Sequence, residues 1–195
     1  MEYPLHLSFK LVALARQISV RDAQSGLVFY VKQKAFKIKE SVTVFADAEQ
    51  TRPLYTINAD RVFDFSARYN FADAATGNYI GSVKRQGMKS FWKAHYEMLD
   101  GERPMLTIRE ENAWTKVLDS LVGELPVIGM FSGYLFHPAY IVTRNDGTLI
   151  MRLEKQAAFF EGKFIITKHA ELDRHEEARA LLSLIMLILL ERGRG

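Results

Sequence analysis

A run of apolar residues near the end of the chain limits what this sequence can fold into more than any other feature. Nine of the ten residues of Leu181–Leu190 are apolar, so every side of a helix built from them is hydrophobic and must be covered by lipid or by protein. From Ala178 to Leu190 such a helix spans about 20 Å, which is short of the ~30 Å hydrocarbon core of a bilayer. We therefore expect a buried core helix over residues 173–192, with a membrane tail anchor as the alternative.

Composition is typical of a globular protein and is compatible with a reducing compartment. The chain has 195 residues, of which 48% are hydrophobic and 25% charged, and we expect a single domain over residues 1–195. It has no cysteine, which excludes disulfides, thiolate metal sites and cysteine nucleophiles. Met1–Pro4 lacks the basic start of a secretory signal. The expected location is therefore cytoplasmic, with peripheral contact to a membrane as a further hypothesis.

The net charge of +3 is unevenly distributed. Residues 1–96 hold 14 Lys and Arg against 8 Asp and Glu, whereas residues 97–195 hold 12 against 15. This asymmetry predicts a basic face and, with it, an anionic partner.

Turn motifs recur along the chain at nearly constant spacing. Phe45–Ala48 is repeated as Phe71–Ala74, 26 residues later, and is followed by Leu99–Gly101 and, after a longer gap, by Asn145–Gly147. Asp, Asn and Gly tolerate the positive φ of hairpin turns, and strand-like sequence flanks each motif. The pattern predicts four consecutive β-hairpins.

The hairpins and the all-apolar helix can cover each other's apolar surfaces. The sheet needs a cover for its apolar face, and the helix needs to be enclosed. We therefore predict a mainly β (α+β) fold, in which a closed antiparallel barrel of about twelve strands surrounds the C-terminal helix. Closure also removes the sheet edges.

This pattern resembles the LURP-one-related family of the tubby C-terminal-like and phospholipid scramblase superfamily. The matching stretches are Phe29–Lys34, Val83–Arg85, Leu106–Glu110, the Asp-containing turns and Leu181–Leu190, within about residues 5–192. The resemblance implies a barrel of about a dozen antiparallel strands around a hydrophobic helix. It implies phospholipid binding only through distant relatives: tubby-like proteins bind phosphoinositides and scramblases move phospholipids. No tubby phosphoinositide motif matches here, so no such site is transferred.

Residues 111–138 form an insertion that this pattern does not contain. Trp114, Val117, Leu118 and Leu121 have the spacing of a short amphipathic helix, and an apolar loop follows. Exposed, that loop would be a contact surface for a partner or a membrane; packed, it would plug one end of the barrel. The candidate contact residues are Val127, Ile128, Met130, Phe131, Leu135 and Phe136.

Basic clusters with aromatic neighbours are the other candidate binding feature. No acidic residue occurs between Asp73 and Glu97, and this interval contains a cationic stretch with Trp92. Such a stretch can contact lipid headgroups or, less favoured here, nucleic-acid phosphates; it can also be a solvated hairpin connection. The candidate lipid- or anion-binding residues are Lys32, Lys34, Lys84, Arg85, Lys89, Trp92 and Lys93.

Catalytic and metal-binding motifs are not found in the sequence. The five histidines are scattered and lack the spacing of metal ligands, and no nucleophile elbow, P-loop or dinucleotide-binding motif occurs. We expect no cofactor and no metal. The favoured hypothesis is a non-enzymatic module that binds anionic phospholipid or a membrane surface. The alternatives are an interaction protein that oligomerises through residues 111–138 and, with least support, an enzyme with a pocket at a barrel mouth.

Overall fold

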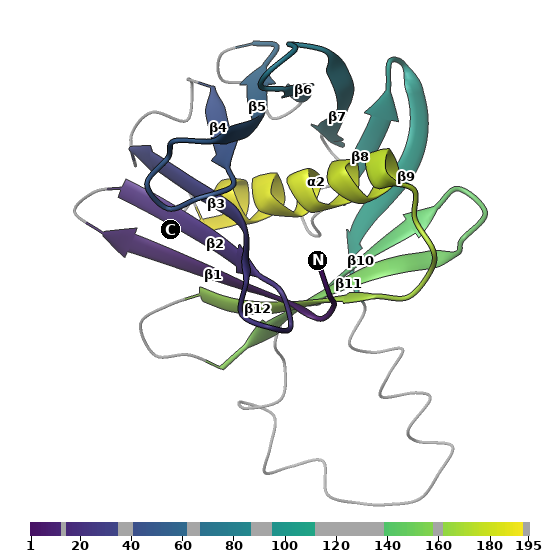
Figure 1. The fold of residues 1–195 in the computed structure, drawn as a ribbon. Coiled ribbons are helices and arrows are strands. Elements are labelled where there is room, and N and C mark those ends of the chain that lie inside the picture. Colours follow the sequence, from purple (N-terminus) through teal and green to yellow (C-terminus); the bar gives the residue numbers. More distant parts are fainter. Residues whose placement is uncertain are drawn as a thin grey trace, which may run out of the picture.

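The computed structural model contains a closed antiparallel barrel with a helix inside it (Figure 1). It describes residues 1–12, 15–34, 41–61, 67–86, 95–111, 139–157 and 162–192. The strands are β1 Leu5–Val12, β2 Ala15–Arg21, β3 Leu27–Lys34, β4 Val42–Phe45, β5 Pro53–Ala59, β6 Arg68–Asp73, β7 Tyr79–Arg85, β8 His95–Asp100, β9 Arg103–Glu110, β10 Ala139–Arg144, β11 Leu149–Gln156 and β12 Gly162–Lys168. The helix is α2, Arg174–Arg192. In the described part of the chain, the predicted twelve-strand barrel and buried C-terminal helix are confirmed.

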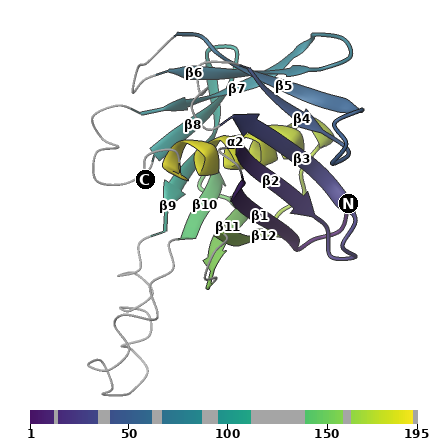
Figure 2. The ribbon, with the colours of Figure 1, turned by 90° about the vertical axis from the view of Figure 1, so that its left-hand side faces the viewer.

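Each strand pairs with its neighbours in sequence, and β1 closes the barrel against β12. Because every ladder is antiparallel, all odd-numbered strands run in the same direction. They end at the edge of the barrel where α2 also ends, which we call the helix-exit end; the opposite edge is the helix-entry end (Figure 2). The insertion, between β9 and β10, leaves and rejoins the barrel at the helix-exit end, and its residues 112–138 lie outside the described residues.

The predicted hairpin turns all lie at the helix-entry end. They join β4 to β5, β6 to β7, β8 to β9 and β10 to β11. Aspartate side chains close the β6–β7 and β4–β5 turns: the carboxylate of Asp73 accepts a 2.9 Å bond from the Thr76 amide, and that of Asp47 a 2.8 Å bond from the Arg52 amide. Gly101 and Gly147 have positive φ, 60° and 88°, as such turns require. Each of the four ladders also shifts register beside its turn, which strengthens the strand twist.

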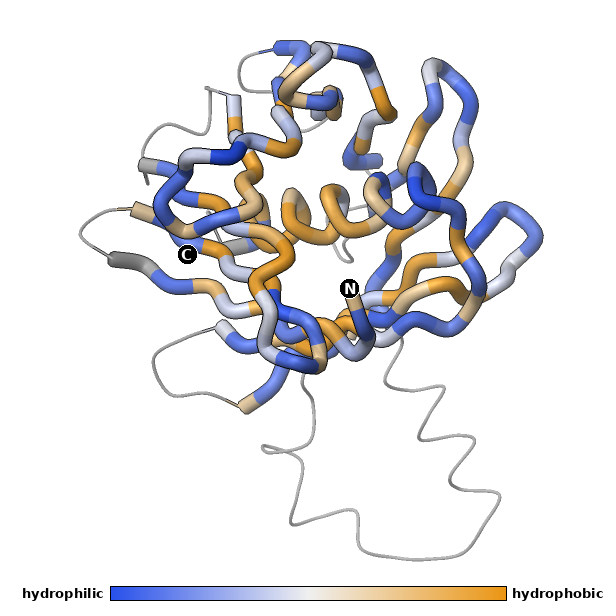
Figure 3. The backbone as a smooth tube through the Cα atoms, viewed as in Figure 1, coloured by the Kyte–Doolittle hydropathy of each residue, from blue (hydrophilic) through white to orange (hydrophobic). Residues whose placement is uncertain are grey.

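Helix α2 fills the barrel from one end to the other, and in Figure 3 it is almost uniformly hydrophobic. Every residue from Ala180 to Leu189 is buried. Buried strand residues such as Val31, Phe71, Ile108 and Leu153 surround it. At about 1.5–3 kcal/mol for each large apolar side chain, this burial is a major part of the driving force for folding.

Polar groups fix the helix where it enters the barrel. Asp173 caps its N-terminus by accepting 2.8 Å bonds from the amides of His175 and Glu176. One turn further, the guanidinium of Arg179 donates to the Ile80 carbonyl and lies 3.2 Å from Asp100. Next to it stands Gly81, with a φ of 146°; a Cβ there would come within 3.0 Å of the Arg179 side chain. A residue without a side chain therefore lets the helix dock against β7.

Candidate anion-binding face

Six consecutive strands of the barrel contain no acidic residue. These are β12, β1, β2, β3, β4 and β5, which are neighbours in that order. The acids within strands belong to the other half of the barrel: Asp73, Glu97, Asp100, Glu110 and Glu154. The strand-borne charge of one half of the barrel is therefore entirely positive.

Four of the cations in this half are exposed on its outer surface. They are Lys163 of β12, Lys10 of β1, Arg21 of β2 and Lys32 of β3. Lys10 pairs across the sheet with Gln17, and Gln17 with Lys32, so the two lysine backbones stand about 10 Å apart. This spacing is close to one Debye length at physiological salt, so these two lysines act on an anionic partner together. We call these four residues the basic face.

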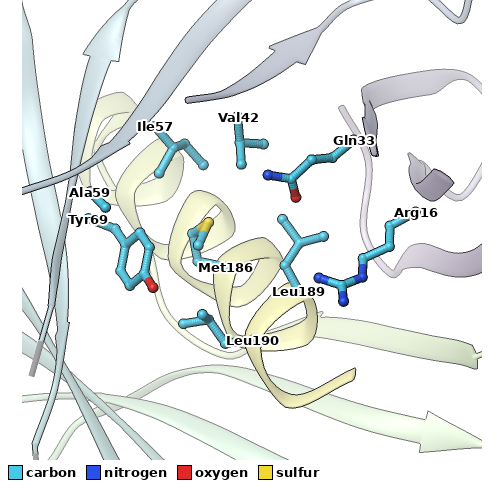
Figure 4. Close-up of a pocket in the computed structure, with 9 residues that line it drawn as sticks. All are labelled: Arg16, Gln33, Val42, Ile57, Ala59, Tyr69, Met186, Leu189 and Leu190. Carbon is cyan, nitrogen blue, oxygen red and sulfur yellow. The ribbon is translucent and has the colours of Figure 1, made fainter. Parts of the chain in front are cut away.

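Arg16 of β2 points into the barrel instead. It is only 8% exposed, pairs across the sheet with Gln33, and its side chain reaches toward Leu189 of α2 (Figure 4). Between these side chains and β4–β6 lies a cavity of about 10 Å³. That space accommodates about one water molecule, so this cavity is far smaller than a substrate pocket.

Arg85, one of the predicted lipid-binding residues, lies at the same end of the barrel beside the helix. Its side chain is 11% exposed, and its guanidinium is 3.9 Å from Glu191 and 5.9 Å from the centre of the Tyr96 ring. The Tyr96 hydroxyl donates a 2.8 Å bond to the same carboxylate. Burial, and then the negative charge of Glu191, raise the pKa of Tyr96. Arg85 thus belongs to a polar cluster that holds the end of α2.

The other predicted cationic residues are spread over different parts of the barrel. Lys32 belongs to the basic face, and Lys34 is the last residue of the same strand. Lys84, half-buried on β7, stands between Arg68 and Glu97 in the sheet register. Because β4, β5 and β6 separate β3 from β7, Lys32 and Lys84 do not form one patch.

The remaining predicted residues lie outside the described residues. They are the cationic and aromatic residues Lys89, Trp92 and Lys93, and the apolar residues Val127, Ile128, Met130, Phe131, Leu135 and Phe136.

Sequence reasoning missed Lys10, Arg21 and Lys163, although the sequence contains a signal for them. The strand segments 5–12, 15–21, 27–34 and 162–168 have cations but no acid, and the segments 42–45 and 53–59 have neither. The excess positive charge of residues 1–96 comes partly from these strands. The segment that contains Lys163 lies far along the chain, and only the pairing of β12 with β1 brings it to the face.

Two features are absent from the described part of the chain: a metal-binding cluster and a membrane-spanning helix. Within these residues, no group of three or more His, Asp or Glu side chains could hold a metal ion. No helix among them has the length and apolar content needed to cross a membrane.

A closed antiparallel barrel around a buried C-terminal helix defines the class of tubby-like barrel proteins. The chain belongs to the LURP-one-related family, whose model matches residues 27–175. The X-ray structure of a protein from Arabidopsis thaliana is similar in fold, with a TM-score of 0.52 over 97% of this chain and 91% of that chain. At 14% sequence identity, this likeness concerns the fold alone. No curated protein shows significant sequence similarity to the chain.

Proposed function

We propose that this protein is a non-enzymatic binding module that recognises the surface of anionic phospholipid membranes through its basic face. The observation that carries the proposal is the run of six neighbouring strands without an acidic residue. Like charges are costly to gather on one side of a folded domain, so their concentration is best explained by an anionic partner.

The expected affinity is low. Each cation near an anionic leaflet contributes about 1 kcal/mol, so four exposed cations contribute about 4 kcal/mol, which corresponds to dissociation constants near the millimolar range. A face of this kind supports reversible, salt-sensitive contact and needs a second signal for stable anchoring. The proposed location is peripheral, at a leaflet facing the cytoplasm.

The interior of the barrel supports binding over catalysis. Helix α2 occupies the space in which a barrel protein would hold a substrate, and the cavity beside Arg16 has a volume of only about 10 Å³. The outer surface is therefore the better candidate for ligand recognition.

Co-sedimentation with vesicles tests the proposal. The protein is mixed with phosphatidylcholine vesicles containing increasing fractions of phosphatidylserine, at low salt and again at about 1 M salt, where the Debye length falls to about 3 Å. We expect binding to rise with the anionic fraction and to disappear at high salt. Failure to bind phosphatidylserine-rich vesicles at low salt would refute the proposal.

A further inference from the structure

A shallow polar groove runs across the basic face. It has a volume of about 160 Å³ and lies on the outside of β1, β2 and β3, beside the turn between β4 and β5. Pockets for whole drug-sized ligands measure about 300–1,000 Å³, so this groove fits a single small chemical group. Its lining residues are Ser8, Lys10, Gln17, Ser19, Arg21, Leu27, Tyr30 and Ala48.

Three hydroxyl-bearing residues form a row across the groove. Ser8 pairs with Ser19 and Ser19 with Tyr30 in the sheet register. The two serine oxygens are 2.8 Å apart, so one of these hydroxyls donates its hydrogen to the other. The second hydroxyl keeps its own hydrogen for a further acceptor. A ligand in the groove would therefore meet at least one hydroxyl donor oriented by its neighbour.

Two cations stand among these hydroxyls. Lys10 comes from β1, and Arg21 ends β2. Arg21 is held by the next turn, because its Nη1 donates a 2.8 Å bond to the Ser25 carbonyl. That turn is itself fixed by Asp22, whose carboxylate accepts a 2.8 Å bond from the Gly26 amide. The guanidinium is thus positioned before a ligand arrives, which lowers the entropy cost of binding.

Two carboxylates next to the groove, among the residues that the structure describes, are engaged in their own turns. Asp22 accepts bonds from the amides of Gln24 and Gly26. Asp47, which precedes the lining residue Ala48, accepts bonds from the amides of Thr51 and Arg52. None of the lining residues is acidic, so the groove itself presents donors and positive charge.

We propose that this groove binds a phosphomonoester group, an inference that rests on the proposed function and names the headgroup chemistry it selects. A phosphomonoester carries a charge of about −1.5 to −2 and three acceptor oxygens, which the two cations, the serine hydroxyls and the side-chain amide of Gln17 can satisfy. A phosphodiester offers fewer oxygens and less charge. The group can come from a lipid such as phosphatidic acid or from free phosphate.

Variants that remove hydroxyls without changing charge separate this site from general electrostatic attraction. The test variant is Ser8→Ala with Ser19→Ala. The matched control is Thr43→Val with Thr56→Val, a cross-strand hydroxyl pair on β4 and β5 outside the groove. Binding is measured to phosphatidylcholine vesicles with phosphatidic acid and to vesicles with phosphatidylserine at equal surface charge. A second arm titrates inorganic phosphate against chloride at equal ionic strength and follows the backbone amide NMR shifts of β1–β3.

We expect the wild type and the control to prefer phosphatidic acid, and the serine variant to lose about tenfold in that preference while still binding phosphatidylserine. Phosphate should shift the amides of Ser8 and Ser19, and chloride should not. A serine variant that retains the preference, together with amides that ignore phosphate, would overturn the site. If wild type binds neither vesicle, the proposed function fails. Phosphate shifts at these amides would then still support the groove, with free phosphate as the source, and their absence would overturn it too.

Discussion

The hydroxyl of Tyr96 donates a 2.8 Å hydrogen bond to the carboxylate of Glu191, which joins strand β8 to the last turns of the buried helix. A second polar contact joins the other end of the helix to the barrel, where Arg144 donates bonds of 2.8 and 2.9 Å to the two carboxylate oxygens of Glu176. The apolar middle of α2 has few directional contacts of its own. Together with the contacts of Arg179 at the entry end, these two contacts fix its depth in the barrel.

Replacing Tyr96 by Phe removes the bond at the helix-exit end and leaves the Glu191 carboxylate without that donor. A hydrogen bond to a charged group contributes about 1.5–3 kcal/mol, and partial exposure of Glu191 reduces this, so we expect a loss of about 1–2 kcal/mol in the free energy of unfolding. Urea denaturation measures it. The control is Tyr30→Phe, on the outer face, which should be close to neutral. Equal stabilities for the two variants would show that the contact does not hold the helix.

An aspartate at Ile185 tests whether the helix is the core of the barrel. Ile185 is 1% exposed, and an unpaired buried charge costs more than the whole stability of many domains. We expect Ile185→Asp to abolish cooperative folding, as seen by circular dichroism and thermal melting. His175→Asp, at an exposed position in the first turn of the same helix, should fold normally. A folded Ile185→Asp protein would contradict the buried-helix architecture.

A substitution at Ser183, two residues before Ile185, should increase the stability of the protein instead. Its side chain is fully buried, and its hydroxyl has no hydrogen-bond partner among the described residues. An unsatisfied buried polar group costs about 1–3 kcal/mol, so Ser183→Ala should raise the free energy of unfolding by about 1 kcal/mol. The urea midpoint should move upward with an unchanged slope. A lower midpoint would mean that the hydroxyl makes a stabilising bond.

The hairpins and the helix could be predicted because their signals are local. Asp47, Asp73 and Gly147 sit in turns whose chemistry can be identified within a few residues, and the apolar run around Ile185 excludes any exposed position. The position of the helix inside the sheet does not follow from a local signal. It could be predicted because both elements have an apolar surface that must be covered.

The basic face could not be predicted in the same way because it depends on register and closure. Lys10 and Lys32 lie on one face because each pairs with Gln17 of the strand between them. Lys163 lies on the same face only because β12 pairs with β1. Clustering in sequence was a poor guide to clustering in space. Arg85, next to Lys84 in the chain, lies beside Glu191 instead.

Acid should destabilise the protein partly through the helix cap. The amides of Glu176 and His175 donate to Asp173 and lower its pKa in the folded state. Its contribution to stability is therefore fully present above the unfolded pKa of about 3.9 and is lost as the pH falls through the folded value. Asp173→Asn keeps a capping side chain but does not titrate. Unfolding free energies measured against pH should fall less steeply below about pH 4 for this variant than for wild type. If the unfolding free energies of the variant and the wild type fall equally steeply at acid pH, this assignment is refuted.

The most direct test of the account reverses charge on two opposite sides of the barrel. One variant carries Lys10→Glu and Lys32→Glu on the basic face. The other carries Arg103→Glu and Arg109→Glu, two exposed cations of β9, which lies across the barrel from β3. Both change the net charge equally, and both are assayed by co-sedimentation with phosphatidylserine-containing vesicles at low salt. The account predicts that the first variant loses binding by about tenfold or more and that the second keeps most of it. Equal losses, or a larger loss for the β9 variant, would contradict the claim that the basic face is the membrane-binding surface.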